Sequence, residues 1–139
     1  MSRRSYKSRF ALITILSVLI LSCGYVDTPP ADQIAHAFEQ RKRDVAVEGE
    51  GTVSRILSDD NAGSRHQRFV VRLASGQTVL LQHNIDLAPR IESLNIGDTV
   101  SFSGEYIWNE QGGLIHWTHH DPASKHKGGW IEHNGRTYE

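Results

Sequence analysis

The chain has 139 residues, 38% hydrophobic and 22% charged, so it is long enough for one domain and too apolar for a wholly disordered protein. Its formal net charge is −1, which argues against a generally basic nucleic-acid-binding protein. It contains a single cysteine, so neither an intramolecular disulfide nor a cysteine-rich zinc motif can form.

Residues 1–22 have the pattern of a signal peptide of the lipoprotein type. The first nine residues carry four cations and no acid, and residues 10–22 form an uncharged apolar run of 13 residues. A membrane-spanning helix needs about 20 apolar residues, so a cleaved signal is favoured over a permanent anchor. The run ends in Leu21 and Ser22 and is followed by Cys23, and these residues together resemble a bacterial lipobox.

The sequence therefore predicts lipidation of Cys23, the only thiol in the chain. An ordinary secretory signal with an incidental cysteine is the alternative. Gly24 follows the cysteine where an inner-membrane retention signal has Asp, so we expect an anchor in the outer membrane and a domain facing the periplasm. Removal of residues 1–22 leaves 11 cations against 16 acids, a net charge of −5, which further disfavours nucleic acid as a partner.

Residues 23–44 contain the lipidated cysteine, a tether and a short helix. The helix is expected over about 30–43, with Ile34 and Phe38 facing the body of the protein. From residue 45 onward, apolar residues alternate with polar ones, which indicates strands. Strands are expected over 45–57, 67–74, 77–83, 99–107 and 114–119. Asn134 and Gly135 predict a turn that joins residues 129–133 and 136–139 in a final hairpin.

This order of elements predicts an all-β domain over residues 45–139, a small OB-like five-stranded Greek-key barrel with a short N-terminal helix and a C-terminal β-hairpin. Residues 96–104 resemble the entry to the fourth strand of OB-fold barrels. A generic small β-barrel is the alternative. In an OB barrel the binding face lies around the second and third strands.

Several segments are distinctive beyond their strand pattern. They are residues 63–69, 83–90, 104–106, 116–122 and 129–133, and the segment 116–122 has the unusual order His-Trp-Thr-His-His-Asp-Pro. With these segments, residues 51–139 resemble a bacterial domain-of-unknown-function family, family 3465, of secreted or lipid-anchored proteins. The resemblance implies one fold unit and export, and it assigns no role to any residue.

Histidines and one acid gather near the C-terminal end of the chain. The candidate metal ligands are His116, His119, His120, Asp121, His126 and His133. Imidazole and carboxylate groups are common ligands of divalent metals such as zinc. Because side chains alternate along a strand, not all of these groups can meet at one ion. Two sets stay open, His116 with His120 and His133, or His119 with Asp121 and His126. In the alternative interpretation, the histidines pack around Trp117 and Trp130.

A second group of polar residues lies at predicted strand ends. The candidate ligand-binding residues are Arg65, His66, Arg68, His83, Asp86, Arg90 and Trp117. We expect a titratable pocket of His66, His83, Asp86, His116 and His120, in which Arg65, Arg68 and Arg90 capture a phosphate or carboxylate. For Arg68, simple exposure to solvent opposite Phe69 is the alternative.

These observations predict an exported, lipid-anchored periplasmic binding or accessory domain with a histidine-rich site for a divalent metal. Its partners would be the membrane, through Cys23, and a small anionic ligand or an envelope protein. A metal-dependent hydrolase of phosphoesters or envelope polymers is one alternative, and an envelope scaffold is another. Ser64 beside His66 has no nucleophile-elbow motif, so the sequence leaves enzymatic activity open.

Overall fold

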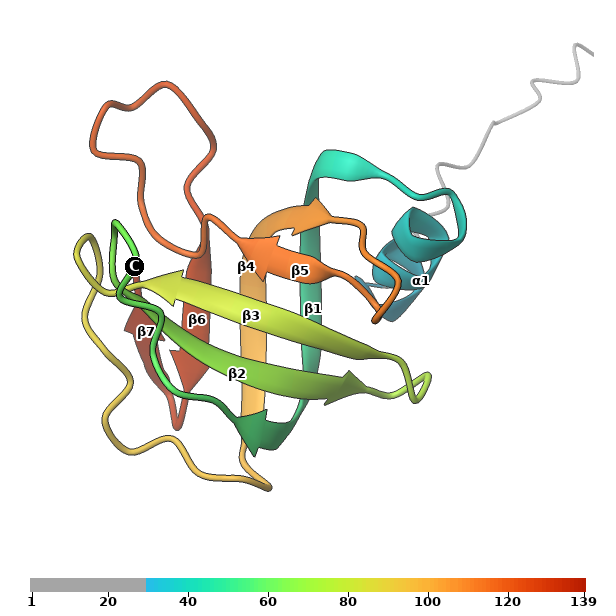
Figure 1. The fold of residues 1–139 in the computed structure, drawn as a ribbon, viewed down its shortest axis with the longest axis horizontal. Coiled ribbons are helices and arrows are strands. Elements are labelled where there is room, and N and C mark those ends of the chain that lie inside the picture. Colours follow the sequence, from blue (N-terminus) through green and yellow to red (C-terminus); the bar gives the residue numbers. More distant parts are fainter. Residues whose placement is uncertain (1–29) are drawn as a thin grey trace, which may run out of the picture.

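The structure is a computed structural model, and it describes residues 30–139. The predicted signal peptide and Cys23 lie outside the described residues. The elements are α1 (Pro30–Glu39), β1 (Arg43–Ile56), β2 (His66–Leu73), β3 (Thr78–Asn84), β4 (Thr99–Ile107), β5 (Leu114–His116), β6 (Trp130–His133) and β7 (Arg136–Tyr138) (Figure 1). Within residues 30–139, no helix is long and apolar enough to cross a membrane.

Five of the strands close into a barrel in the order β1-β2-β3-β5-β4, and β4 pairs back with β1. Only β3 and β5 are parallel among the paired strands. This arrangement confirms the predicted OB-like barrel. β6 pairs with residues 100–103 of β4, and β7 pairs with β6, so the C-terminal hairpin extends the wall of the barrel.

The long strand β1 takes part in both halves of the barrel wall. Its residues 43–52 pair with β4, and residues 51–56 pair with β2, with a bulge between Val53 and Arg55. Glycine is required where β1 bends over the core. A Cβ at Gly49 would lie 2.7 Å from the ring of Phe102, and one at Gly51 would lie 2.5 Å from the carbonyl oxygen of Arg72.

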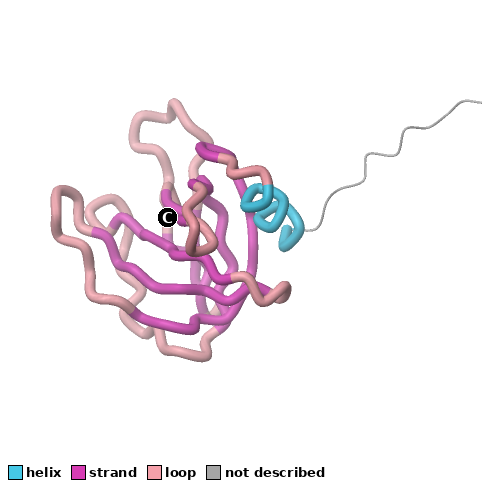
Figure 2. The backbone as a smooth tube through the Cα atoms, turned by 45° about the vertical axis from the view of Figure 1, so that its right-hand side comes forward, coloured by secondary structure: helices cyan, strands magenta, loops and turns pink. Residues whose placement is uncertain are grey.

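The core fills the barrel and is closed at one side by α1. Alternate residues of β2 and β3 point inward, as the sequence pattern predicts. The helix α1 lies beside β1 at the edge of the barrel (Figure 2). Ile34 and Ala37 of α1 are buried against the core, and Phe38 packs partly buried against it. Ile131 and Tyr138 are also buried, so the C-terminal hairpin contributes to the same core.

Two predicted element ends differ from the structure by three or more residues. The helix ends at Glu39 instead of residue 43, and Arg41 and Asp44 have left-handed backbone conformations with φ of 50° and 56° in the turn that follows. β5 ends at His116 instead of residue 119, because Trp117 has a φ of 56° and cannot continue the strand. The predicted turn between β6 and β7 is confirmed: Asn134 and Gly135 both have positive φ.

Candidate functional site: the outer face of β2 and β3

Strands β2 and β3 present one continuous face to the outside of the barrel, which we call the β2–β3 face. Its residues are His66, Arg68, Val70 and Arg72 from β2, and Thr78, Leu80, Gln82 and Asn84 from β3. Their neighbours in sequence point into the core. None of these eight residues is acidic. The face corresponds to the surface on which OB barrels bind their ligands.

A pocket of about 410 Å³ lies on this face between the strands and the turn at residues 109–113. Its lining residues are Arg55, Leu57, Val70, Thr78, Val79, Leu80, Asn109, Gln111 and Gly113. The turn is held against β3, since the carbonyl oxygen of Gly112 accepts hydrogen bonds from Gln77 Nε2 at 2.9 Å and from the Tyr106 hydroxyl at 3.2 Å. A Cβ at Gly112 would lie 1.9 Å from the carbonyl oxygen of Thr78, so this close approach needs glycine.

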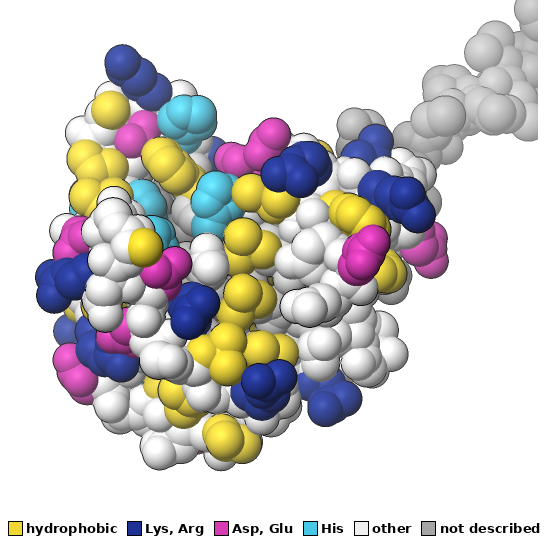
Figure 3. All heavy atoms as spheres, in the orientation of Figure 1, with side chains coloured by type: hydrophobic (Ala, Val, Ile, Leu, Met, Phe, Trp, Pro, Cys, Tyr) yellow, Lys and Arg dark blue, Asp and Glu magenta, His cyan; other side chains and the backbone are white. Residues whose placement is uncertain are grey.

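Three arginines surround the apolar centre of the β2–β3 face. Arg55 pairs with Val70 across β1 and β2, and Arg68 and Arg72 lie two residues to either side of Val70. Arg68 Nε donates to the carbonyl oxygen of Ser58 at 2.9 Å. The guanidinium groups of Arg55 and Arg72 have no partner within residues 30–139. Figure 3 shows this face with a stripe of hydrophobic side chains, cations beside its lower part and histidines near its upper part.

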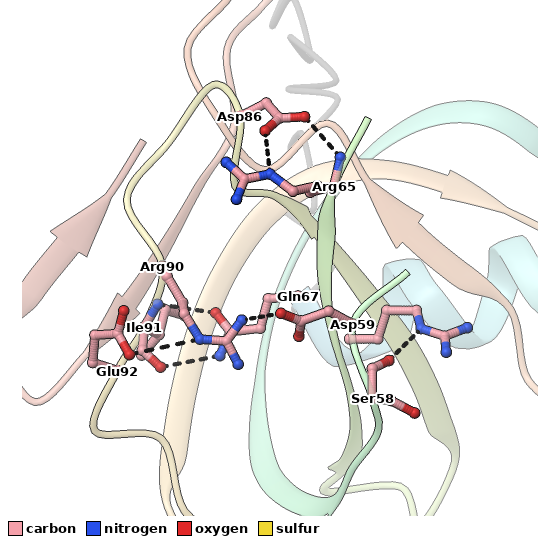
Figure 4. Close-up of polar contacts among 9 residues, drawn as sticks. Ser58, Asp59, Arg65, Gln67, Asp86, Arg90, Ile91 and Glu92 are labelled. Carbon is pink, nitrogen blue, oxygen red and sulfur yellow. Dashed lines mark hydrogen bonds and ion pairs between the residues drawn. The ribbon is translucent and has the colours of Figure 1, made fainter. Parts of the chain in front are cut away.

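The other two predicted anion-binding arginines are engaged in ion pairs (Figure 4). Arg65 Nε lies 2.7 Å from Asp86 Oδ1, and the backbone N–H of Arg65 donates to Asp86 Oδ2 at 2.8 Å. Both contacts lower the pKa of Asp86, and the backbone hydrogen bond has the larger effect. Arg90 pairs with Asp59, and its Nε lies 3.7 Å from Glu92. The structure therefore does not bring the predicted arginines together as one anion site; two of them join loop 57–65 to the connection 85–98.

Two buried polar side chains also position the connection 85–98. Gln67 Nε2 donates to the carbonyl oxygen of Ile91 at 3.0 Å, and its Oε1 accepts from the N–H of Ile91 at 2.9 Å (Figure 4). His83 Nε2 lies 3.1 Å from the carbonyl oxygen of Pro89, and its Nδ1 lies 2.9 Å from the Thr118 hydroxyl. A carbonyl only accepts, so Nε2 carries the proton and, in the neutral ring, Nδ1 accepts from Thr118.

Burial lowers the pKa of His83, and the neighbouring imidazoles of His119 and His66 lower it further. His83 is fully buried, so its role in the structure is to join β3 to the segments on either side of it. The expected pocket of five residues is formed only in part. His66, His83 and Asp86 lie near one another, but His116 faces outward from β5 and His120 is exposed.

The predicted metal ligands lie in separate surroundings. His116 Nε2 lies 3.5 Å from Glu105 Oε1, and His133 Nε2 lies 2.8 Å from Asp98 Oδ2. The carboxylate of Asp121 accepts backbone N–H groups of its own loop, from Ala123, Lys125 and His126. Across residues 30–139, no three histidine, cysteine, aspartate or glutamate side chains form a group that could hold a metal ion. Neither predicted ligand set is brought together.

Trp117 organises the remaining histidines in the loop at residues 117–129. Its indole ring lies 5.0 Å from the ring of His119 and 5.1 Å from that of His126, centroid to centroid. His119 is buried, and its Nδ1 lies 2.7 Å from the carbonyl oxygen of His120. These contacts agree with the alternative interpretation, in which the histidines pack around tryptophan. Trp117 lies away from the pocket on the β2–β3 face and is not among its lining residues.

The sequence reasoning missed Arg55, because the β-bulge next to it reverses the alternation of β1 just before this residue. The place of Arg72 on the outer face could have been predicted from the alternation of β2, because Arg72 lies on the same face as Arg68. The turn residues Asn109 and Gln111 gave no functional signal, since their place over the face depends on the parallel pairing of β3 with β5.

Comparisons with known proteins agree with the resemblance seen in the sequence. A family model described as "Protein of unknown function (DUF3465)" matches residues 17–139. A search of curated proteins found no match. The family match spans most of the chain and includes every strand of the barrel. The chain therefore belongs to the DUF3465 family.

Proposed function

We propose that this protein is a lipid-anchored envelope protein that binds an anionic ligand on the β2–β3 face. The observation that carries the proposal is the placement of Arg55 and Arg72 on one side of the barrel, without ion-pair partners in the described part of the chain, with Arg55 in the lining of the pocket on the β2–β3 face. This face has no acid among its eight outward residues, although acids outnumber cations in the chain as a whole.

The chemistry of the face favours carboxylate or phosphate groups. Guanidinium groups bind both of them through paired hydrogen bonds. Leu57, Val70 and Leu80 would contact the apolar part of the same ligand. The residues that line the pocket include no aromatic ring. Sequence-independent binding of single-stranded nucleic acid uses such rings as stacking platforms, so an anionic polymer or metabolite without bases fits better.

The location of this activity rests on the sequence of residues 1–24. A lipid on Cys23 would hold the barrel at a membrane surface, seven residues before the start of α1. Export would place the β2–β3 face in the periplasm, where anionic envelope components would be its ligands. No group of residues in the described chain favours the metal-dependent hydrolase, since none brings three ligands together. The function we propose is binding of an anion, because the described residues place unpaired cations beside a pocket on the β2–β3 face.

A charge-matched pair of variants tests the β2–β3 face. The full chain, purified in detergent, is titrated with fluorescent inorganic polyphosphate and, separately, with poly-glutamate. The double variant Arg55→Ala/Arg72→Ala removes two cations from the face. The control Lys125→Ala/Arg136→Ala removes two exposed cations from the loop at 117–129 and from β7. A hydrogen bond to a charged group contributes about 1.5–3 kcal/mol, so we expect at least a roughly tenfold weaker Kd in the first variant alone.

The two polymers separate phosphate from carboxylate ligands. An equal loss of affinity in both double variants would show nonspecific attraction to charge, and the β2–β3 face would then not be the site. The proposal would be contradicted if neither polyphosphate nor poly-glutamate bound the wild-type protein at low salt. Circular dichroism of each variant checks that the barrel is retained.

A further inference from the structure

One edge of β1 has no strand beside it along the first half of the strand. Residues 43–52 pair with β4 on one edge, whereas β2 joins the other edge only from Gly51 onward. Within the described chain, residues 43–50 are therefore left unpaired on the β2 side. An unpaired edge of this length is a template for another extended chain, and natural barrels normally avoid it.

The direction of the backbone groups at this edge follows from Val53. Its N–H donates to the carbonyl oxygen of Asp98 at 2.8 Å, and its carbonyl oxygen accepts from the N–H of Gly97 at 2.8 Å, immediately before β4. In an antiparallel strand, both groups of a residue point to the same side, and the side alternates from residue to residue. The register with β4 is unbroken from Val45 to Thr52, so Ala46 and Glu48 direct their N–H and C=O groups to the open edge.

A groove separates this edge from α1. Its volume is about 450 Å³, and its lining residues are Gln33, His36 and Ala37 of α1, Lys42, and Val45, Ala46 and Val47 of β1. A second hollow of about 250 Å³ shares Gln33, Ala46 and Val47 and adds Glu48 and Lys127. The groove therefore follows the open edge from the start of β1 to Glu48, with the helix as its opposite wall.

The groove fits an extended peptide. An extended backbone offers acceptors and donors at the spacing of Ala46 and Glu48, and peptides that add to a sheet edge bind in this way. Ala37 and Val45 give the groove apolar walls for alternate side chains. Just before β1, the side chain of Lys42 lines the groove and has no ion-pair partner within residues 30–139. A peptide antiparallel to β1 would end at this cation.

We propose that the open edge of β1 binds the extended C-terminal segment of another protein as an additional antiparallel strand, with the terminal carboxylate at Lys42. The groove shares no residue with the pocket on the β2–β3 face. This interaction goes beyond the proposed function, since it adds a protein partner to a separate surface.

Two proline variants test the direction of the backbone groups. Proline has no N–H, so it is tolerated where the N–H is free and harmful where a ladder bond is lost. Ala46→Pro removes an N–H from the open edge, whereas Val47→Pro removes one that faces β4. We expect Ala46→Pro to shift the thermal midpoint by a few degrees at most, and Val47→Pro to lower it by roughly 10 °C or more. The reverse order would overturn the assignment of the edge.

The binding test uses a phage library of random octapeptides with free C-termini, selected on the full chain in detergent. Enriched peptides are synthesised with a carboxylate or an amide at the C-terminus, and their Kd is measured by fluorescence anisotropy. We expect at least tenfold weaker binding for the amidated peptides, for Ala46→Pro and for Lys42→Glu. Lys125→Glu, a charge reversal in the exposed loop at 117–129, should bind like the wild type.

The proposal is overturned if no peptide is enriched, if amidation leaves the Kd unchanged, or if Ala46→Pro binds as tightly as the wild type. Lys42→Glu keeps the test valid if the proline variant does not fold. The variant Arg55→Ala/Arg72→Ala should bind these peptides normally, because it alters only the β2–β3 face. Loss of polyphosphate or poly-glutamate binding and loss of peptide binding are therefore distinguishable.

Discussion

Nε2 of His133 lies 2.8 Å from Oδ2 of Asp98, and this contact joins β6 to the turn that leads into β4. The side chain of His133 is fully buried, whereas that of Asp98 is partly exposed. The same carboxylate oxygen accepts the backbone N–H of Asn95 at 2.8 Å. The hydrogen bond from the N–H of Asn95 lowers the pKa of Asp98 most, and the hydrogen bond with the His133 side chain lowers it further. The pair thus fixes both the turn and the C-terminal hairpin.

Replacement of His133 should destabilise the barrel strongly. His133→Ala removes a buried ring and its contact with Asp98, and the cavity and lost hydrogen bond together should cost about 2–4 kcal/mol in the free energy of unfolding. Urea denaturation measures this value. Glu132→Ala is the matched control, because Glu132 is the exposed neighbour on the same strand and should change stability by less than about 0.5 kcal/mol. Similar values for both variants would contradict a stabilising role of the pair.

Stability should fall between neutral and mildly acidic pH because of His83. Its pKa is lowered from the ordinary value of 6.5 in the folded state, chiefly by burial. Below pH 6.5 the unfolded chain takes up a proton that the folded chain does not bind, so stability is lost as the pH falls from 6.5 toward the lowered pKa.

The His83→Gln variant should show a flatter dependence of unfolding free energy on pH below 6.5 than the wild type. His120→Gln, at an exposed position, should retain the wild-type dependence. The measurement is urea denaturation at a series of pH values. An unchanged slope in His83→Gln would show that another group carries the effect.

The loop at 117–129 should depend on the carboxylate of Asp121. The backbone N–H groups of Ala123 and then His126 lower the pKa of this carboxylate, so its contribution is present above the ordinary value of 3.8 and is lost as the pH falls through the lowered pKa. Asp121→Ala should speed hydrogen exchange of the amides of Ala123 and His126 several-fold at neutral pH. Lys125→Ala, which keeps the carboxylate, should exchange like the wild type. Equal exchange in both variants would contradict this role.

The proposed lipidation at Cys23 gives a prediction about location. In a bacterial host, the full chain should fractionate with the outer membrane, and Cys23→Ala should appear in the soluble periplasmic fraction or keep its uncleaved signal. Mass spectrometry of the purified chain should show two ester-linked acyl chains and one amide-linked chain on Cys23. Mature protein that lacks any lipid and begins at another residue would support the ordinary secretory signal instead.

The fold was largely predictable because the barrel follows local rules. Alternation of apolar residues located β2, β3 and β4 to within one or two residues, and the pair Asn134 and Gly135 located the last turn. The end of β5 was not predictable from local pattern. Trp117 leaves the strand with a left-handed backbone, and the distant segment at Gly129 passes so close that a Cβ there would lie 2.1 Å from the carbonyl oxygen of Trp117.

The candidate site was predictable only in part. The sequence indicated an OB-type face on β2 and β3 and named Arg68 as a candidate for it, with exposure opposite Phe69 as the alternative. The pairs Arg65 with Asp86 and Arg90 with Asp59 join residues 21 and 31 positions apart, so no local pattern reveals that these arginines are already bound. The number of histidines likewise suggested a metal cluster. The sequence does not show that His116 lies near Glu105 whereas His133 lies near Asp98.

The pairing of β6 with β4 has a consequence for the order in which the protein is made. Phe102 of β4 pairs with Ile131 of β6, and both are fully buried. Until residues 130–138 have left the ribosome, the edge of β4 beside Val100 and Phe102 has no neighbour, although β1 and β5 can already pair with β4. The core therefore lacks Ile131 and Tyr138 until the last hairpin has been made. For a chain exported as we propose, this late completion of the core would favour passage through a secretion channel, since a chain that folded earlier would block it.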